Sequence, residues 1–408
     1  MSSGVTAARG FRAAAVEAGI KAGRTDLALL VSDRPCVASG VFTTNLAKAA
    51  PVLVSAQHLM SGSARAVIVN AGCANAATGE QGLADARETV ALTAEALGCP
   101  VAEVLVCSTG VIGVNLPMAK IRAAIPVALA GLSSEGGNAA ARAIMTTDTK
   151  PKESSRTVNL GGVQVTIGGM AKGAGMIAPS LAPLNIPLNT PLHATMLAFF
   201  TMDATVDRAT LDRLLIDAVG PTFNRITVDS DTSTNDTAIV LANGASGAAP
   251  ITEAGPAYNV LRDAFREICR DLALMMIRDG EGVQRIAEIV VKGARSADDA
   301  LRIARTIADS PLVKTALHGG DPNWGRILAA AGRAGVDFDI HRVDVYIGDV
   351  FVCEGGAARP YDEKAAHEEM LKDPGRLTVD LHAGDVSGSM WMCDLTKSYV
   401  EINAHYRT

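Results

Sequence analysis

The chain is poor in the features that mark nucleic-acid-binding and membrane-spanning proteins. Aromatic residues make up only 4% of its 408 residues, the formal net charge is −6, and no run of Lys and Arg occurs. A polyanionic partner such as a nucleic acid is therefore not expected. No stretch approaches the roughly 18 uncharged apolar residues of a membrane-spanning helix. Arg9 and Arg12 are not followed by an apolar segment, so we expect no signal peptide.

Paired cysteines and clustered metal ligands are also missing. The seven cysteines are odd in number and widely spaced, and no C-x-x-C pair begins a zinc site. The seven histidines are scattered, without an H-E-x-x-H pair. This pattern favours a reduced, soluble, cytoplasmic protein that needs no metal.

Small and apolar residues are what the chain has in abundance. Apolar residues make up 48%, charged residues 20%, and there are 39 glycines, a composition that can bury a core. The length allows one large domain or two packed lobes. Strand-like and helix-like segments mix without a regular βαβ rhythm, which favours α+β layers over a doubly wound parallel sheet.

Two predicted strands in the first half end in polar and glycine residues. The apolar run 66–69 leads into Asn70-Ala71-Gly72, and the run 104–106 leads into Cys107-Ser108-Thr109-Gly110. Between them, residues 83–97 have helical periodicity, and Gly98 marks the end of that helix. Polar side chains at neighbouring strand ends predict a functional site there.

The second half contains clearer helix signals. One apolar stripe predicts a long helix that ends before Gly280, with Leu261, Phe265, Ile268, Leu272 and Met275 on its buried face. Ser296 with Asp299 resembles a capping box that opens a helix through about Ile307. Alternating patterns predict strands over 343–347 and 377–381.

Residues 183–194 form three near-copies of a Pro-Leu unit. Prolines at a period of four exclude a helix and favour extended backbone, so we predict a loop. It ends immediately before Thr195, and the apolar run 196–200 predicts a buried strand.

Two suggestive motifs fail on inspection. The segment 229–234 begins like a calcium loop, but Thr234 stands where that loop needs glycine, which leaves a polar loop. The glycine-rich segment 168–173 has no Ser or Thr after its lysine and is not a phosphate loop, nor does it complete a dinucleotide fingerprint.

A series of further motifs occurs in one order along nearly the whole chain: Asn70–Ala76, Cys107–Gly113, Ala143–Thr149, Met170–Ile177, Ala194–Leu197, Asp279–Gly282, Asp321–Arg326 and Asn403–Thr408. Together they resemble the ornithine acetyltransferase (glutamate N-acetyltransferase) family of arginine biosynthesis. The resemblance implies a layered α/β sandwich of the autoproteolytic ornithine acetyltransferase and DmpA-like type.

The resemblance also implies self-cleavage between Ala194 and Thr195. The products are an N-terminal alpha chain of residues 1–194 and a C-terminal beta chain of residues 195–408, and two of each assemble into a heterotetramer. The new α-amine of Thr195 has an intrinsic pKa of about 8 and can act as base for its own hydroxyl. Without the surrounding motifs, the simpler interpretation is that Thr195 merely begins a strand.

The site residues follow from the same resemblance. Thr195 is the nucleophile, and Thr109 with Gly110 forms the oxyanion hole, although most Ser-Thr-Gly tripeptides are ordinary turns. The implied substrate-binding residues are Thr146 (or its neighbour Thr147), Lys172, Thr195, Glu281, Asn403 and the terminal Thr408. An isolated Lys or Glu is more often a solvated surface residue.

The implied reaction moves an acetyl group from N2-acetylornithine to glutamate through acetyl-Thr195. No cofactor is expected, and the sequence leaves open whether acetyl-CoA also serves as donor. The alternatives are a related aminopeptidase or amidohydrolase, in which water is the acceptor, and an uncleaved inactive relative that serves as a scaffold.

The Pro-Leu insert departs from the family pattern, in which the nucleophile follows sooner. We expect it to slow processing modestly and to leave the mature site unchanged. On this view, deletion of 183–194 leaves cleavage at least as fast.

Overall fold

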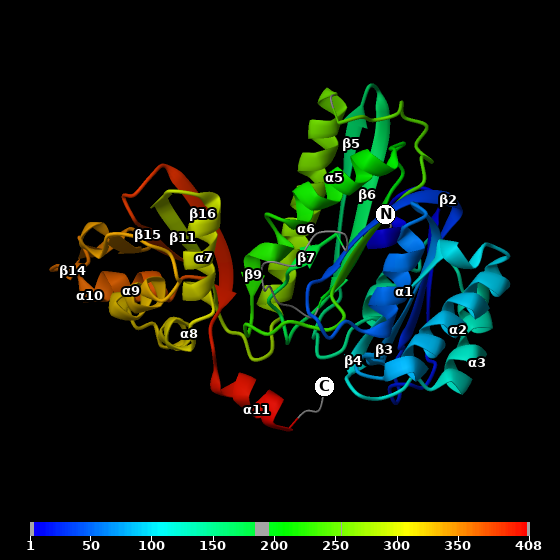
Figure 1. Ribbon diagram of the computed structural model, residues 1–408, viewed down its shortest axis with the longest axis horizontal. Helices are drawn as coiled ribbons and strands as arrows, with labels where there is room; N and C mark the ends of the chain where they lie inside the picture. Colours follow the sequence, from blue (N-terminus) through cyan, green and yellow to red (C-terminus); the bar gives the residue numbers. More distant parts are fainter. Residues whose placement is uncertain (1–3, 184–195, 254, 406–408) are drawn as a thin grey trace. The chain divides into compact units, whose positions relative to one another are not determined.

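The computed structural model describes residues 4–183, 196–253 and 255–405, which form two compact units (Figure 1). Of the described residues, unit 1 holds those up to Asn224 and those of Asp231–Met276, and unit 2 holds Arg225–Ser230 and residues 277–405. The predicted break between Ala194 and Thr195 lies outside the described residues. The division into two processed chains therefore stays a prediction.

A mixed sheet of nine strands forms the centre of unit 1 in the part of the chain that the structure describes. Its main order is β4-β3-β2-β10-β8-β6-β5, with β1 and β7 also paired to β2. The pairs β3–β4 and β8–β10 are parallel, and the other pairs are antiparallel. The strands are β1 (Phe11–Val16), β2 (Leu27–Thr43), β3 (Ser63–Cys73), β4 (Val104–Val111), β5 (Lys152–Leu160), β6 (Val163–Lys172), β7 (Leu181–Ala182), β8 (Leu197–Met202) and β10 (Thr237–Ala242).

Helices cover both faces of this sheet. Alternate residues of a strand point to opposite faces, so Ile68 shares one core with Val90 of α2 and Val67 shares another with Ala140 of α4. On β8, the ring of Phe200 meets that of Phe265 of α6 edge to face at 4.9 Å. The helices of unit 1 are α1 (Ala50–Leu59), α2 (Gly79–Leu97), α3 (Met118–Ala130), α4 (Gly137–Ala143), α5 (Arg208–Val219) and α6 (Pro256–Arg278), whose last two residues belong to unit 2.

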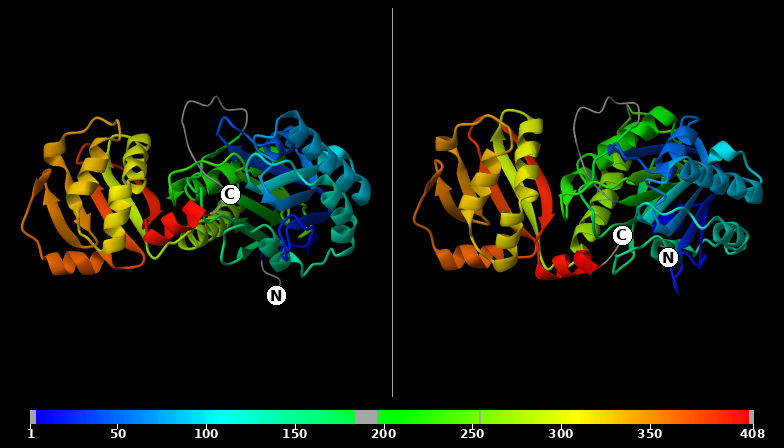
Figure 2. Two further views of the ribbon diagram at one scale, coloured as in Figure 1. Left: turned by 90° about the horizontal axis from the view of Figure 1, so that it is seen from below. Right: turned by 60° about the horizontal axis from the view of Figure 1, so that its bottom comes forward.

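Unit 2 is built on a second sheet, with the order β14-β13-β12-β15-β11-β16-β9. Residues of the helices α7 to α10 share one core with Ile289, Val345 and Leu377, which lie on a single face of this sheet. Figure 2 shows these helices and strands in two further views. The elements are β9 (Ile226–Thr227), β11 (Ile286–Ala294), α7 (Ala297–Ala308), α8 (Pro311–Gly319), α9 (Trp324–Gly332), β12 (Asp344–Ile347), β13 (Val350–Glu354), β14 (Ala357–Ala358), α10 (Glu363–Met370), β15 (Gly375–Asp380), β16 (Val386–Cys393) and α11 (Lys397–His405).

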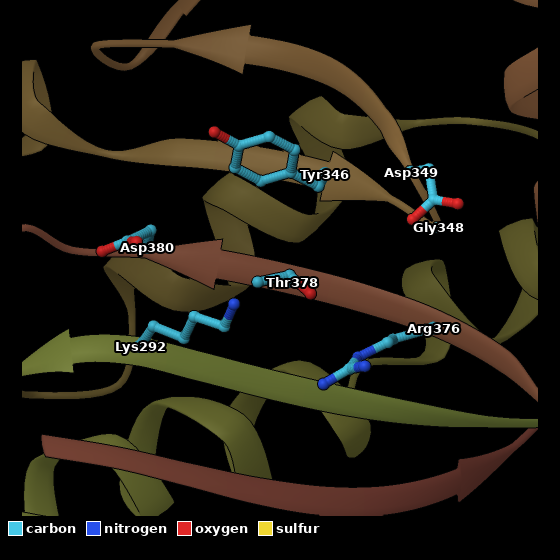
Figure 3. Close-up of a pocket in the computed structure, with 7 residues that line it drawn as sticks. All are labelled: Lys292, Tyr346, Gly348, Asp349, Arg376, Thr378 and Asp380. Carbon is cyan, nitrogen blue, oxygen red and sulfur yellow. The ribbon is translucent and has the colours of Figure 1, made fainter.

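The opposite face of the second sheet carries polar side chains (Figure 3). Lys292 of β11 stands beside Asp380 of β15 in register, and Glu288 stands beside Arg376. A pocket of about 380 Å³ lies on this face, lined by Lys292, Tyr346, Gly348, Asp349, Arg376, Thr378 and Asp380. Opposite charges on neighbouring strands are a normal way to stabilise an exposed sheet face.

Most predicted helix boundaries are confirmed. The helix expected over 83–97 is α2, which begins earlier, at Gly79, and which Gly98 ends in the left-handed region with φ 64°. Ser296 accepts a hydrogen bond from the N–H of Asp299 at the start of α7. The prediction for Met275 is wrong, because its side chain is 39% exposed while Met276 is fully buried. Cys269 and Ala273 are also buried, so the buried face of α6 is wider on the side of Met276 than on the side of Met275.

The predicted strands are also present, as β3, β4, β8, β12 and β15. Two mixed sheets covered by helices confirm the expected α+β layered architecture. In the described residues, none of the helices is both long enough and apolar enough to span a bilayer.

Candidate active site

The polar ends of β3 and β4 lie side by side, as the sequence predicts. The two strands are parallel, and Asn70 stands opposite Ser108 in their register. The Ser108 hydroxyl donates a 2.6 Å hydrogen bond to Oδ1 of Asn70, whose amide donates to the carbonyl oxygen of Cys73 at 2.8 Å. These contacts hold the two strand ends together immediately before Thr109.

Gly110 is required by the close approach of the two strands. Its φ of 130° is a conformation that other residues rarely adopt. A Cβ atom at this position would lie 2.3 Å from the carbonyl carbon of Gly72. No side chain fits here, so the backbone of β4 can meet β3 only with glycine at residue 110.

Thr109 and Lys172 meet in the interior of unit 1. They are 1% and 2% exposed, and Nζ of Lys172 donates a hydrogen bond to Oγ1 of Thr109 at 3.2 Å. Lys172 is the last residue of β6, so two strands that are not neighbours in the sheet supply the pair. A hydroxyl that accepts from an ammonium group retains its own hydrogen for another acceptor. The pair therefore presents a polarised O–H donor.

Asp148 is a buried carboxylate beside two lysines, Lys152 and Lys172. Its Oδ1 accepts hydrogen bonds from Nζ of Lys152 at 2.6 Å and from the N–H of Gly173 at 2.7 Å, and its Oδ2 accepts from the N–H of Thr146 at 3.0 Å. Burial disfavours the carboxylate, but the charges of Lys172 and Lys152 and the hydrogen bonds outweigh burial and lower the pKa of Asp148 to about 2. An ionised Asp148 thus connects Thr146 to the turn after Lys172.

Asn235 and Asp236 form a second connection, which the sequence analysis missed. The amide nitrogen of Asn235 donates to the carbonyl oxygens of Ala74 at 2.7 Å and Ser108 at 2.8 Å. The carboxyl group of Asp236 accepts from the N–H of Met196. Two adjacent residues before β10 therefore hold the end of β4 and the start of β8. The only sequence signal was two polar residues directly before an apolar strand.

Glu281 and Asn403 contact each other in unit 2. The amide of Asn403 donates to Oε2 of Glu281 at 2.8 Å and to the carbonyl oxygen of Tyr399 at 3.0 Å. Glu281 is buried, at 7% exposure. The next residue, Gly282, has a φ of 70°, and a Cβ there would lie 2.5 Å from the backbone nitrogen of Tyr399. The turn of Asp279–Gly282 therefore packs closely on the start of α11.

The structure thus brings the predicted site residues together in two sets. Thr109, Gly110, Thr146 and Lys172 belong to unit 1, while Glu281 and Asn403 belong to unit 2. Ala194, Thr195 and Thr408 lie outside the described residues. Over the described ranges, no three His, Cys, Asp or Glu side chains are grouped so that they could hold a metal ion.

Comparison with known proteins gives one consistent result. A family model described as the ArgJ family matches residues 12–408. A protein of Symbiobacterium thermophilum named "Arginine biosynthesis bifunctional protein ArgJ" is 48% identical, over 100% of this chain and 99% of its own length. A protein of the same name from Geobacter sulfurreducens is 49% identical, over 98% of this chain and 99% of its own.

A solved structure agrees with these relatives. The crystal structure of an arginine biosynthesis bifunctional protein from Bacillus halodurans is 40% identical, with a TM-score of 0.51. The match covers 52% of this chain and 100% of the solved chain. The family model spans nearly the entire sequence, and the relatives are similar over their full lengths. This chain belongs to the ArgJ family.

Proposed function

We propose that this chain is an N-acetyltransferase of arginine biosynthesis, which moves an acetyl group from N2-acetylornithine to glutamate through acetyl-Thr195. Full-length relatives named for arginine biosynthesis support the pathway. The contact between Lys172 and Thr109 is the observation that carries the chemistry. It provides a polarised hydroxyl beside Gly110, as stabilisation of an acyl-transfer oxyanion requires.

In the first half-reaction, the Thr195 hydroxyl attacks the acetyl carbonyl of N2-acetylornithine. The hydroxyl proton passes to the α-amine of Thr195, and the carbonyl oxygen becomes an oxyanion that accepts from the Thr109 hydroxyl and the Gly110 N–H. Collapse of this intermediate breaks the C–N bond. The departing α-amine of ornithine takes the proton, and the acetyl group stays on Thr195 as an ester.

In the second half-reaction, the α-amine of glutamate attacks the ester carbonyl. The same donors stabilise the second oxyanion, and the Thr195 oxygen leaves and regains a proton. The products are N-acetylglutamate and the free enzyme. Each half-reaction uses the oxyanion hole once, so a defect in the hole should slow both.

Ammonium and carboxylate groups on the substrates need partners of opposite charge. We assign the side-chain ammonium of ornithine to Glu281, whose position is supported by Asn403. Thr146, Lys172 and Thr408 complete the proposed substrate-binding set. A lysine in this set can either pair with a substrate carboxylate or support the acyl carbonyl. The contact of Lys172 with Thr109 favours the second.

Self-cleavage before Thr195 uses the same chemistry on the carbonyl of Ala194. Attack by the Thr195 hydroxyl shifts the acyl group from nitrogen to oxygen, and water then hydrolyses the ester and frees the α-amine. We further propose that the resulting alpha and beta chains assemble as two of each in the cytoplasm. The reaction needs no cofactor, and acetyl-CoA is proposed as a second donor because the relatives are named bifunctional.

One experiment tests the function directly. The purified protein is analysed by intact mass and then incubated with N2-acetylornithine and glutamate, with N-acetylglutamate measured over time. We expect two fragments, one of which begins Thr-Met-Leu-Ala-Phe, and acetyl transfer that depends on glutamate. The Thr195→Ala variant should stay a single chain and transfer nothing.

The other outcomes identify the alternatives. Release of acetate at the same rate without glutamate would indicate an amidohydrolase. A single uncleaved chain without transfer would indicate an inactive relative. Efficient cleavage of Thr195→Ala would show that residue 195 is not the internal nucleophile.

A further inference from the structure

Lys21 lies in a loop that a buried carboxylate holds in place. The loop joins β1 to β2, and the N–H groups of Ala18, Ile20 and Lys21 donate to the carboxylate of Asp26 at 2.6, 2.5 and 2.7 Å. Asp26 is fully buried. Three hydrogen bonds to one carboxylate fix the backbone at Lys21 before any ligand binds.

The stem of Lys21 packs against Gly72 of β3, which stands opposite Gly110 of β4. A Cβ atom on Gly72 would lie 2.8 Å from Cγ of Lys21, and a Cβ atom on Gly110 would lie 2.3 Å from the carbonyl carbon of Gly72. Lys21 therefore lies against Gly72, and Gly72 in turn lies against Gly110. The lack of a side chain at Gly72 leaves room for the stem of Lys21 on this strand.

The ammonium group of Lys21 lies beside the residue before Thr146. Its Nζ donates to the carbonyl oxygen of Met145 at 2.8 Å, and an ammonium group has three hydrogens to donate. Partial burial lowers the pKa of Lys21 and the charges of Arg24 and Lys172 lower it further, against the opposite effects of Asp26 and Asp148. The charged form thus lies in an environment that an additional anion would stabilise.

We propose that Lys21 binds a carboxylate group of the amino-acid substrates. The inference rests on the proposed acetyl transfer, in which both donor and acceptor carry an α-carboxylate and glutamate carries a γ-carboxylate as well. Lys172 donates to Thr109 and is assigned to the acyl carbonyl, and Lys21 supplies a second cation next to Thr146. The backbone N–H of Lys21 is held by Asp26, and its side-chain stem packs on Gly72.

The alternative is that Lys21 has a purely structural role, in which its hydrogen bond to Met145 holds the loop in place. Three variants separate the two roles. Lys21→Met keeps the length of the stem and removes the charge, and Lys21→Arg keeps a cation. Lys120→Met is the matched control, because exposed Lys120 donates to the carbonyl oxygen of Gly19 in the same loop.

Self-cleavage and acetyl transfer are measured for each variant beside the unchanged protein. We expect Lys21→Met to cleave normally and to raise KM for its carboxylate substrate about 10- to 100-fold with little change in kcat, as loss of a charge-assisted hydrogen bond predicts. Lys21→Arg should recover part of that loss, and Lys120→Met should behave like the unchanged protein.

Substrate analogues identify which carboxylate is bound. Glutamine has only the α-carboxylate, 4-aminobutanoate has only the γ-carboxylate, and N-acetyl-1,4-diaminobutane is the donor without a carboxylate. If Lys21 binds the α-carboxylate, Lys21→Met loses kcat/KM with glutamine and not with the other two. If it binds the γ-carboxylate, the loss occurs with 4-aminobutanoate and not with glutamine.

Three results would overturn the inference. The first is an unchanged KM of Lys21→Met for both substrates. The second is a loss of kcat/KM by Lys21→Met that is equally large with the carboxylate-free donor. The third is a defect in self-cleavage that Lys120→Met shares. The first two would leave Lys21 as a purely structural contact. A protein that cleaves but transfers nothing even without substitution would instead refute the proposed function on which the inference rests.

Discussion

The carboxyl group of Asp236 accepts a hydrogen bond from the backbone N–H of Met196, the residue after the predicted nucleophile. Its other oxygen, Oδ2, is buried and has no hydrogen-bond partner among the described residues. Burial raises the pKa of Asp236 well above its usual value, against the effects of the Met196 hydrogen bond and the charge of Lys172. Burial therefore disfavours the charged form of this carboxyl group, which contacts the chain just before β8.

Substitutions of Asp236 should show whether this residue acts as a hydrogen-bond acceptor for Met196 or as a negative charge. Asp236→Asn keeps an oxygen for the Met196 N–H and cannot ionise, so we expect cleavage and kcat within about tenfold of the unchanged protein. Asp236→Leu leaves a buried N–H without an acceptor, at a cost of about 1–3 kcal/mol, and should slow cleavage much more. Cleavage is followed on denaturing gels. If both variants were equally impaired, the ionised carboxylate would be the required form.

Thr109 should contribute to the transition state more than to substrate binding. Thr109→Ala removes the hydroxyl that accepts from Lys172, and we expect kcat to fall about 10²- to 10³-fold with a smaller change in KM. Thr109→Ser keeps the hydroxyl and serves as the control. A rise in KM alone, in steady-state kinetics with N2-acetylornithine, would mean that Thr109 contacts the bound substrate instead.

Asp148 should make stability depend on pH in the acid range. Its pKa of about 2 in the folded chain lies below the unfolded value of about 3.9, so its stabilisation is complete above about pH 4 and is lost as the pH falls toward 2. The difference corresponds to roughly 2–3 kcal/mol. Asp148→Asn should lower stability at pH 7 and flatten this dependence.

The measurement is urea unfolding from pH 7 to pH 2 in the Thr195→Ala background, where the chain stays whole. Asp33→Asn is the control, because Asp33 pairs with Arg12 at the exposed surface and such pairs contribute about 0–1 kcal/mol. Equal effects of Asp148→Asn at pH 7 and pH 2 would show that Asp148 stabilises the fold by packing and not by charge.

Glu281 should recognise the side-chain ammonium of ornithine. Glu281→Gln keeps an oxygen for the amide of Asn403 and removes the charge. We expect KM for N2-acetylornithine to rise about 10- to 100-fold, as for loss of a charged hydrogen bond. The N-acetyl derivative of norvaline lacks the ammonium group and should be unaffected. Equal losses with both compounds would exclude the assignment.

Local pattern was enough to predict the two strands and the polar residues near their ends, because alternation and glycine positions are short-range signals. The strands run further than predicted, so that Asn70, Ser108 and Thr109 lie inside β3 and β4. The resemblance suggested Lys172 and Thr109, but their contact depends on β6 and β4 meeting through tertiary packing. Asn235 and Asp236 could not be found this way, because their partners Ala74, Ser108 and Met196 lie far from them in the sequence. Met275 was misassigned because neighbouring buried residues, and not ideal periodicity, set the buried face of α6.

The strand arrangement also changes the expectation for the Pro-Leu insert. Ala182 of β7 pairs with Phe42 of β2, which pairs with Thr237 of β10, which pairs with Leu197 of β8. Three strand spacings separate Ala182 from Leu197 by about 14 Å. If residues 183–194 were deleted, three peptide units would have to bridge that gap, and they reach only about 11 Å.

Complete deletion of 183–194 should therefore pull β7 away from β2 and slow self-cleavage, whereas deletion of 183–190 should not. The shorter deletion leaves seven peptide units between Ala182 and Leu197, which span about 25 Å at most and reach easily. We expect it to cleave at the normal rate and to show an unchanged kcat per processed site. Both variants are compared by time-resolved gels after translation in vitro. Normal cleavage after complete deletion would mean that the precursor does not require the pairing of β7 with β2.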